Sequence, residues 1–99
     1  MKLDRIINYY QPRHQLKKLS EEVYEFQEAV LDAEYYHLVS NVFEKHMEEE
    51  YADILVLLEQ FKVYYGLNCS NILKIMKRKI DRQNERINKE IKYGSTNNY

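Results

Sequence analysis

The chain has 99 residues, which is enough for one domain with a limited core and too short for two. It contains 2 Gly and 1 Pro, with 31% charged and 44% apolar residues, and this composition favours an all-α fold because strands and tight turns need more Gly and Pro. The single cysteine, Cys69, excludes an intrachain disulfide and a cysteine-based zinc site. Without a long apolar run or a signal-peptide core, we expect a soluble, cytoplasmic protein with no membrane partner.

Charge is distributed unevenly along the chain. Residues 1–65 carry 7 Lys/Arg and 13 Asp/Glu, a net charge of −6, whereas residues 66–99 carry 8 and 3, a net charge of +5. Two interpretations fit: the acidic and basic halves pack together, or an acidic metal site faces a basic anion site. A nucleic-acid partner is disfavoured, since the chain has a net charge of −1 and no overall positive field.

The first half of the sequence predicts two helices and a loop. A short helix is expected over residues 3–10. A longer helix then begins near Pro12, a residue that suits the first turn because its missing N–H has no helical partner there. This second helix extends to about Tyr35, and a loop follows around His37–Asn41.

The second half predicts two more long helices. The third extends to about residue 65, where Gly66 ends it in a left-handed conformation. Asn68 or Ser70 caps a fourth helix that runs to about residue 92 and ends at Gly94. We therefore expect a single domain over residues 1–93 and a flexible tail over residues 94–99.

Positions about 100° apart around a helix share a face, and this spacing gives the second and third helices one apolar stripe each. The second-helix stripe contains Leu16, Leu19, Val23, Phe26 and Val30, and the third-helix stripe contains Met47, Ile54, Leu57, Leu58, Phe61 and Tyr65. Glu22 lies at the edge of the first stripe, with Glu25 further round and Glu21 further still. Glu50 falls inside the second stripe and Asp53 borders it.

A carboxylate that faces a core is costly unless it is paired, hydrogen-bonded or bound to a metal. Residues three apart on a helix share a face, so Glu22/Glu25 and Glu50/Asp53 each present two carboxylates in one direction. Antiparallel packing of the two helices would bring the four together as an all-oxygen site that suits Mg²⁺ or Mn²⁺. The alternative is a solvated acidic face, which is the interpretation that we give to Glu48 and Glu49.

The fourth helix combines an apolar stripe with cations at its border. The stripe contains Ile72, Leu73, Met76, Ile80, Ile87 and Ile91. The cations Lys79, Arg82 and Arg86 lie along one border of this stripe, and the polar residue Gln83 lies among them. A metal site and a basic stripe together are what a magnesium–polyphosphate substrate requires. A solvated basic face, or cations that favour the helix C-terminus, is the simpler alternative.

Two acidic motifs and one basic motif carry a family resemblance. The acidic motifs are Glu21-Glu22-x-x-Glu25 and Glu50-x-x-Asp53, with 24 residues between Glu25 and Glu50. The third motif is Lys79-x-Asp81-x-Gln83-x-x-Arg86, in which Gln83 stands where Asn is more usual. Over residues 12–90 the chain resembles the MazG-like all-α nucleoside triphosphate pyrophosphohydrolases, a group that also includes dimeric dUTPases and dCTPases.

The resemblance implies Mg²⁺-dependent cleavage of a nucleoside triphosphate between its α and β phosphates. It implies Glu22, Glu25, Glu50 and Asp53 as metal ligands and Glu21 as a residue that orients or activates water. It also implies that Lys79, Gln83 and Arg86 contact the nucleotide, with Arg82 near a phosphate. The implied fold is a four-helix-bundle-type assembly completed by a second subunit, as a homodimer or homotetramer. The alternative function is a non-catalytic MazG-like bundle that binds a nucleotide or a protein partner.

Overall fold

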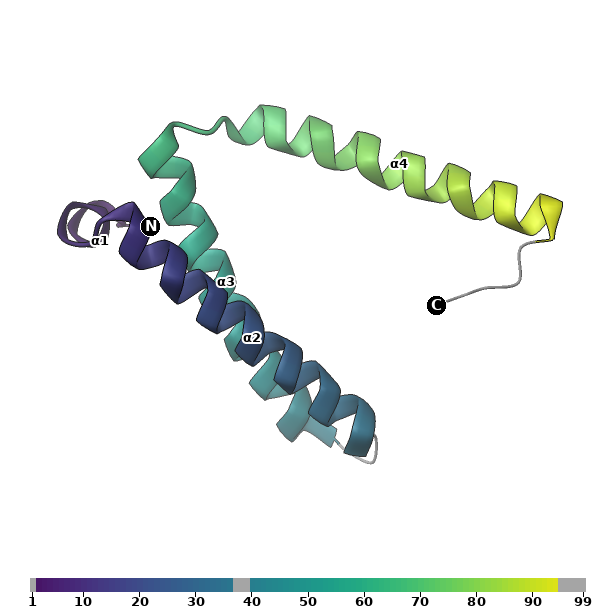
Figure 1. Ribbon diagram of the computed structural model, residues 1–99, viewed down its shortest axis with the longest axis horizontal. Coiled ribbons are helices and arrows are strands. Elements are labelled where there is room, and N and C mark those ends of the chain that lie inside the picture. The colour runs from purple at the N-terminus through teal and green to yellow at the C-terminus, as the bar shows by residue number, and fades with distance from the viewer. Residues whose placement is uncertain (1, 37–39, 95–99) are drawn as a thin grey trace. The chain divides into compact units, whose positions relative to one another are not determined.

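The structure is a computed structural model that describes residues 2–36 and 40–94, and these residues form four α-helices and no β-strand (Figure 1). The helices are α1 (Asp4–Tyr9), α2 (Pro12–Tyr36), α3 (Ser40–Tyr65) and α4 (Cys69–Tyr93). The predicted all-α class is therefore confirmed. Helices α1 to α3 belong to a unit that ends at Gly66, and α4 belongs to a second unit that begins at Leu67. No helix of the described chain is both long enough and apolar enough to cross a membrane.

The first unit is built on an antiparallel hairpin of α2 and α3, with α1 packed against α3 (Figure 1). Near one end of the hairpin, Gln15 Nε2 donates a hydrogen bond of 2.7 Å to Gln60 Oε1. Further along, the rings of Phe26 and Tyr51 meet edge to face with centroids 5.9 Å apart. Positions later in α2 thus pair with positions earlier in α3, which is the antiparallel arrangement that the convergence of the carboxylates requires.

The packed face of each hairpin helix follows a spacing of alternately three and four residues. Buried or partly buried positions with this spacing are Gln15, Leu19, Glu22, Phe26 and Ala29 on α2, and Met47, Glu50, Ile54, Leu57, Phe61 and Tyr64 on α3, where Gln60 is buried beside Phe61. This spacing is typical of helices that pack at a small crossing angle, side by side over their length. Two carboxylates, Glu22 and Glu50, therefore lie within the packed faces.

The packed face of α2 is rotated away from the predicted apolar stripe. Leu16 is 56% exposed, and Val23 and Val30 also remain exposed, while Gln15 and Glu22 are buried. On α3, the predicted stripe residues Leu58 and Tyr65 are likewise exposed. The predicted stripes are thus buried only in part: Leu19 and Phe26 on α2 are partly buried, and most of the stripe residues on α3 are buried or partly buried. A wheel centres on the apolar side chains, whereas the packed face of α2 also includes the polar residues Gln15 and Glu22.

The helix ends agree with the predicted signals at three positions. Asn68 Oδ1 accepts a hydrogen bond of 2.9 Å from the backbone N–H of Asn71, so Asn68 caps α4 in preference to Ser70. Gly66 and Gly94 have φ values of 62° and 78°, the left-handed conformation that a glycine adopts at a helix end.

The predicted loop over residues 37–41 was too long. Residues 40 and 41 already belong to α3, and Phe43 is partly buried one turn later. Packing of this side chain extends the helix toward its N-terminus, beyond the point that local propensity suggested. Residues 37–39 of the predicted loop, and the predicted tail beyond Gly94, lie outside the described residues.

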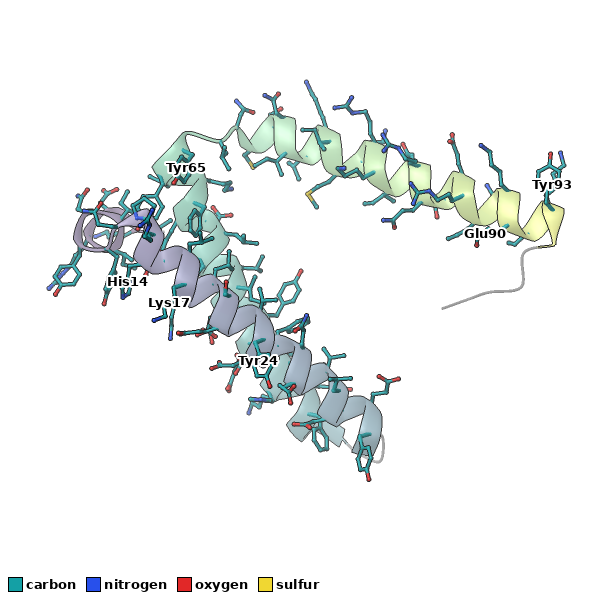
Figure 2. All side chains as sticks on the ribbon, viewed as in Figure 1. His14, Lys17, Tyr24, Tyr65, Glu90 and Tyr93 are labelled. Carbon is teal, nitrogen blue, oxygen red and sulfur yellow. The ribbon has the colours of Figure 1, made fainter. Side chains whose placement is uncertain are left out.

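Helix α4 is strongly amphipathic and has no buried residue. Its predicted apolar stripe is exposed apart from Ile72, which is partly exposed. The side chains project on all sides of this helix in Figure 2. Within the described residues, nothing covers the apolar stripe of α4 to form a core.

Candidate metal centre

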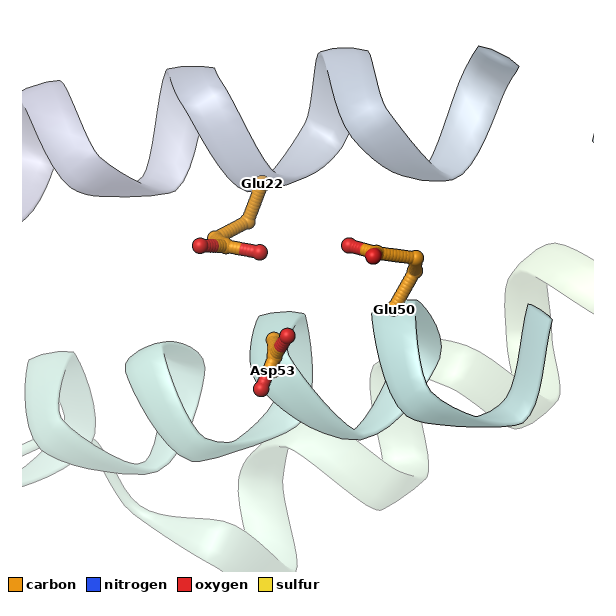
Figure 3. Close-up of side chains that lie close together, drawn as sticks. All are labelled: Glu22, Glu50 and Asp53. Atoms are coloured by element: carbon orange, nitrogen blue, oxygen red, sulfur yellow. The ribbon is translucent and has the colours of Figure 1, made fainter. Parts of the chain in front are cut away.

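Three carboxylates from the two helices of the hairpin meet between them. Glu22 points from α2 toward α3, Glu50 points from α3 toward α2, and Asp53 lies on the next turn of α3 (Figure 3). One oxygen atom from each carboxylate lies within 4.8 Å of the others. The hairpin register therefore brings Glu22 together with two residues that lie 28 or more positions further along the sequence, and we call this group the carboxylate cluster.

Burial distinguishes this cluster from an ordinary acidic helix face. Glu22 is only 6% exposed, Glu50 is partly buried and Asp53 is exposed. The Oε2 atoms of Glu22 and Glu50 are buried and have no hydrogen-bond partner among the described residues. A buried carboxylate oxygen without a partner is costly, so a bound cation or a hydrogen-bond donor at either atom would stabilise the protein.

The charge state of Glu50 reflects this crowding. Burial is the largest cause that raises its pKa above the ordinary value, followed by the charge of Glu25 and a hydrogen-bonding interaction with Glu25. The charges of Glu22 and Asp53 add to the increase in the pKa. A proton on Glu50 relieves the repulsion in the absence of another cation, and a divalent cation would relieve it without that proton.

The other predicted acidic residues lie around the cluster. Glu25 is exposed and outside the group of three, but its interaction with Glu50 places it at the edge of the cluster. Glu21 is also exposed, and its Oε2 atom lies 3.8 Å from Lys18 Nζ. Of the four carboxylates predicted as ligands, the structure thus brings three together and leaves Glu25 beside Glu50.

Lys18 is a neighbour of the cluster that the sequence analysis missed. Its Nζ atom lies 3.4 Å from Glu22 Oε1, and its side chain is half exposed. The hydrogen bond with Glu22 is the largest cause that raises the pKa of Lys18, followed by the charge of Glu22. The signal was available in the sequence, because Lys18 and Glu22 stand four residues apart on one helix, at the spacing of an intrahelical ion pair.

The predicted nucleotide-binding residues lie on α4. Lys79, Arg82, Gln83 and Arg86 are all exposed, and their spacing of three and four residues places them on one side of that helix. They belong to the second unit, whereas the carboxylate cluster belongs to the first.

The cluster suits a hard divalent cation. Its ligand atoms are carboxylate oxygens, without the thiolate or imidazole groups that favour zinc. Oxygens on opposite sides of Mg²⁺ lie about 4.2 Å apart, since each Mg–O bond is about 2.1 Å. Oxygens at adjacent corners of the octahedron lie about 3.0 Å apart, so three oxygens within 4.8 Å of one another are near the spacing that one such cation requires.

Comparison with protein-family models, with curated proteins and with solved structures finds no match to this chain.

Proposed function

We propose that this protein is a Mg²⁺-dependent nucleoside triphosphate pyrophosphohydrolase that converts a (deoxy)nucleoside triphosphate into the monophosphate and pyrophosphate. A role in cytoplasmic nucleotide-pool control would follow from that activity. The observation that carries the proposal is the meeting of Glu22, Glu50 and Asp53, with two buried carboxylate oxygens left without a partner. The order and spacing of the acidic motifs, which resemble those of MazG-like enzymes, supply the reaction class.

Glu22, Glu50 and Asp53 would hold Mg²⁺ or Mn²⁺, and Glu25, beside Glu50, would complete the ligand set. A bound divalent cation supplies charge stabilisation at the phosphoryl oxygens and lowers the pKa of water. The two helices of the hairpin contribute ligands from both sides, so the rigid backbone of α2 and α3 fixes their separation. Little rearrangement is then needed when substrate binds, which favours catalysis through preorganisation.

The remaining residues would position the substrate and move one proton. Water attacks the α phosphorus, the bond from that phosphorus to the bridging oxygen breaks, and pyrophosphate leaves. Glu21, exposed next to Glu22, would accept the proton that the water loses. Lys79, Arg82 and Arg86 would bind phosphate oxygens through charge-assisted hydrogen bonds, and Gln83 would contact the sugar or base.

A homo-oligomer belongs to the proposal. Large apolar side chains are exposed on all three long helices, among them Leu16, Leu55 and Ile80. A second copy of the chain, as a homodimer or within a homotetramer, would bury part of this surface. The nucleotide site would then be completed by the assembly.

The activity is tested by incubating the purified protein with each common NTP and dNTP in Mg²⁺ and measuring pyrophosphate and phosphate separately. We expect pyrophosphate from at least one nucleotide. Glu50→Gln should lower the rate by about 100-fold, the upper range for losing a metal-site group, while Glu48→Gln, a change on the exposed side, should keep it within about twofold. Saturable nucleotide binding without turnover would instead favour the non-catalytic bundle, and release of phosphate alone would contradict the reaction class.

A further inference from the structure

We propose that Lys18 is a substrate-binding residue of the carboxylate cluster: its ammonium group pairs with Glu22 while the divalent cation is absent and contacts a phosphate oxygen of the metal-bound substrate. The inference rests on the proposed function. It adds a phosphate ligand from the hairpin itself, in the same unit as Glu22, Glu50 and Asp53. None of the three sequence motifs includes this residue.

The position of Lys18 connects the buried cluster to solvent. The side chain of Glu22 is 8% exposed and that of Lys18 is 51% exposed, yet their charged atoms lie 3.4 Å apart. The ammonium group therefore contacts the cluster at its solvent side, where a polyphosphate chain would approach. Lysine suits this role because its ammonium is a compact charge with three donors on a flexible stem.

The ion pairs that Lys18 makes are loose. Its hydrogen bond to Glu22 is long, at 3.4 Å, compared with the usual range of about 2.7–2.9 Å for a charge-assisted hydrogen bond, and its distance to Glu21 is 3.8 Å. By contrast, Lys62 Nζ lies 2.9 Å from Glu59 Oε2. The ammonium of Lys18 thus makes long contacts with two carboxylates from a half-exposed position, and ion pairs at such positions contribute little to stability.

Lys18 does not satisfy the cluster. It contacts Glu22 Oε1, and the Oε2 atoms of Glu22 and Glu50 remain without a hydrogen-bond partner among the described residues. One monovalent charge at the rim leaves most of the negative charge of the cluster uncompensated. When Glu22 and Glu50 bind a divalent cation, the attraction between Glu22 and Lys18 weakens, and a phosphate oxygen replaces the carboxylate as the partner of the ammonium.

The test compares Lys18→Met with Lys17→Met. Lys17 is the adjacent exposed lysine and has no ion pair in the described part of the chain, so its variant removes the same charge from the same turn (Figure 2). Calorimetry measures Mn²⁺ binding without nucleotide, and then binding of inorganic tripolyphosphate to the Mn²⁺-loaded protein. Tripolyphosphate carries the phosphate chain and makes the result independent of base preference.

We expect Lys18→Met to bind Mn²⁺ about threefold more tightly than the native protein, because the competing ammonium is gone, a change within the range for an exposed ion pair. It should bind tripolyphosphate about tenfold more weakly, as the loss of a hydrogen bond to a charged group predicts. Lys17→Met should change each affinity by less than about twofold, as a surface charge remote from the ligand does. Thermal melts of both variants should match that of the native protein.

Equal tripolyphosphate affinities of the two variants would overturn the inference, as would weaker Mn²⁺ binding by Lys18→Met or no tripolyphosphate binding by the Mn²⁺-loaded native protein. Lys18→Arg should retain most of the tripolyphosphate affinity, because it keeps a cation in place, and a tenfold loss there would also overturn it. Failure of the native protein to bind Mn²⁺ has a different meaning, since it would refute the metal site and the proposed function with it.

Discussion

Glu22 and Glu50 each have a buried carboxylate oxygen, but their surroundings differ. Glu22 has Lys18 at 3.4 Å and is 6% exposed, whereas the pKa of Glu50 is raised by burial and by the neighbouring carboxylates. A group with a raised acidic pKa destabilises the folded protein when it is charged. In the metal-free cluster the charged carboxylates therefore repel one another, and a divalent cation would compensate this repulsion.

This strain predicts a pH dependence of stability. The folded state binds a proton at Glu50 more tightly than the unfolded state, whose carboxyl has the ordinary pKa of 4.5. The contribution of Glu50 to the unfolding free energy therefore falls as pH rises from 4.5 through the raised pKa of the folded state, and it is most unfavourable above that pKa. Urea unfolding without divalent cations, over this range, should show Glu50→Gln becoming more stable relative to the native protein as pH rises.

Two controls accompany this prediction. Glu49→Gln, at an exposed position next to Glu50, should show a difference from the native protein that does not change in this way with pH. Addition of Mg²⁺ should remove the pH-dependent difference between Glu50→Gln and the native protein, because the cation then compensates the Glu50 charge. A constant difference in unfolding free energy between Glu50→Gln and the native protein at every pH would show that folding does not raise the pKa of Glu50.

The site could be predicted from the sequence in part. Glu50 faces inward as expected because Ile54, Leu57 and Phe61 define the same face of α3. The full burial of Glu22 was not expected, since it depends on the rotation of α2 against α3. That rotation is set by pairs between the helices, such as Gln15 with Gln60, which the spacing within one helix does not contain.

At the scale of the elements, the hairpin positions the site. Gln15 and Gln60 are 5% and 2% exposed, and their side chains form a hydrogen bond between α2 and α3. Gln15 Oε1 also lies 2.8 Å from His14 Nδ1. A buried polar pair of this kind favours one alignment of two helices over its neighbours, because a slip leaves the Gln15 Nε2 donor and the Gln60 Oε1 acceptor without each other.

A double-mutant cycle tests the coupling of these two glutamines. Gln15→Ala or Gln60→Ala alone should lower the unfolding free energy by about 1–3 kcal/mol, because each leaves a buried amide unpaired. The double variant Gln15→Leu/Gln60→Leu should lose less than the sum of Gln15→Leu and Gln60→Leu, since it leaves no amide unpaired. Urea denaturation measures all of these, and strictly additive leucine variants would show that the hydrogen bond does not couple the helices.

Helix boundaries were more predictable than helix faces. Pro12, Asn68 and the two glycines act through local backbone geometry, so the sequence identifies them directly. The start of α3 was predicted too late because Phe43 is partly buried and its packing is not local. Faces and boundaries set by tertiary contact are therefore the features that the sequence leaves open.

At the scale of the whole molecule, the described residues bury little apolar surface. Ala29 and Leu57 are the buried hydrophobic residues among those whose burial the structure describes, residues 2–35 and 43–94, and no residue of α4 is buried. A chain with this much exposed apolar surface is expected to associate, because association removes that surface from water.

Association predicts that stability depends on protein concentration. The melting temperature should rise with concentration by mass action, and sedimentation should show a dimer or tetramer. Ile80→Glu places a charge in the apolar stripe of α4 and should shift the equilibrium toward the monomer, whereas Glu85→Gln, an exposed polar change on the same helix, should not. A monomer whose melting temperature is the same at all concentrations would contradict this expectation.

The central claim is that Glu22, Glu50 and Asp53 form a divalent-cation site, and Mn²⁺ titration of Glu22→Gln and Glu21→Gln by calorimetry tests it most directly. The two residues are neighbours with equal charge, but Glu22 is buried in the cluster and Glu21 is exposed. We predict one saturable site per chain in the native protein, weakened at least about tenfold by Glu22→Gln, as expected for loss of a ligand. Glu21→Gln should change the affinity by less than about twofold, as a surface charge does. Absence of saturable binding, or an equal loss in both variants, would contradict the claim.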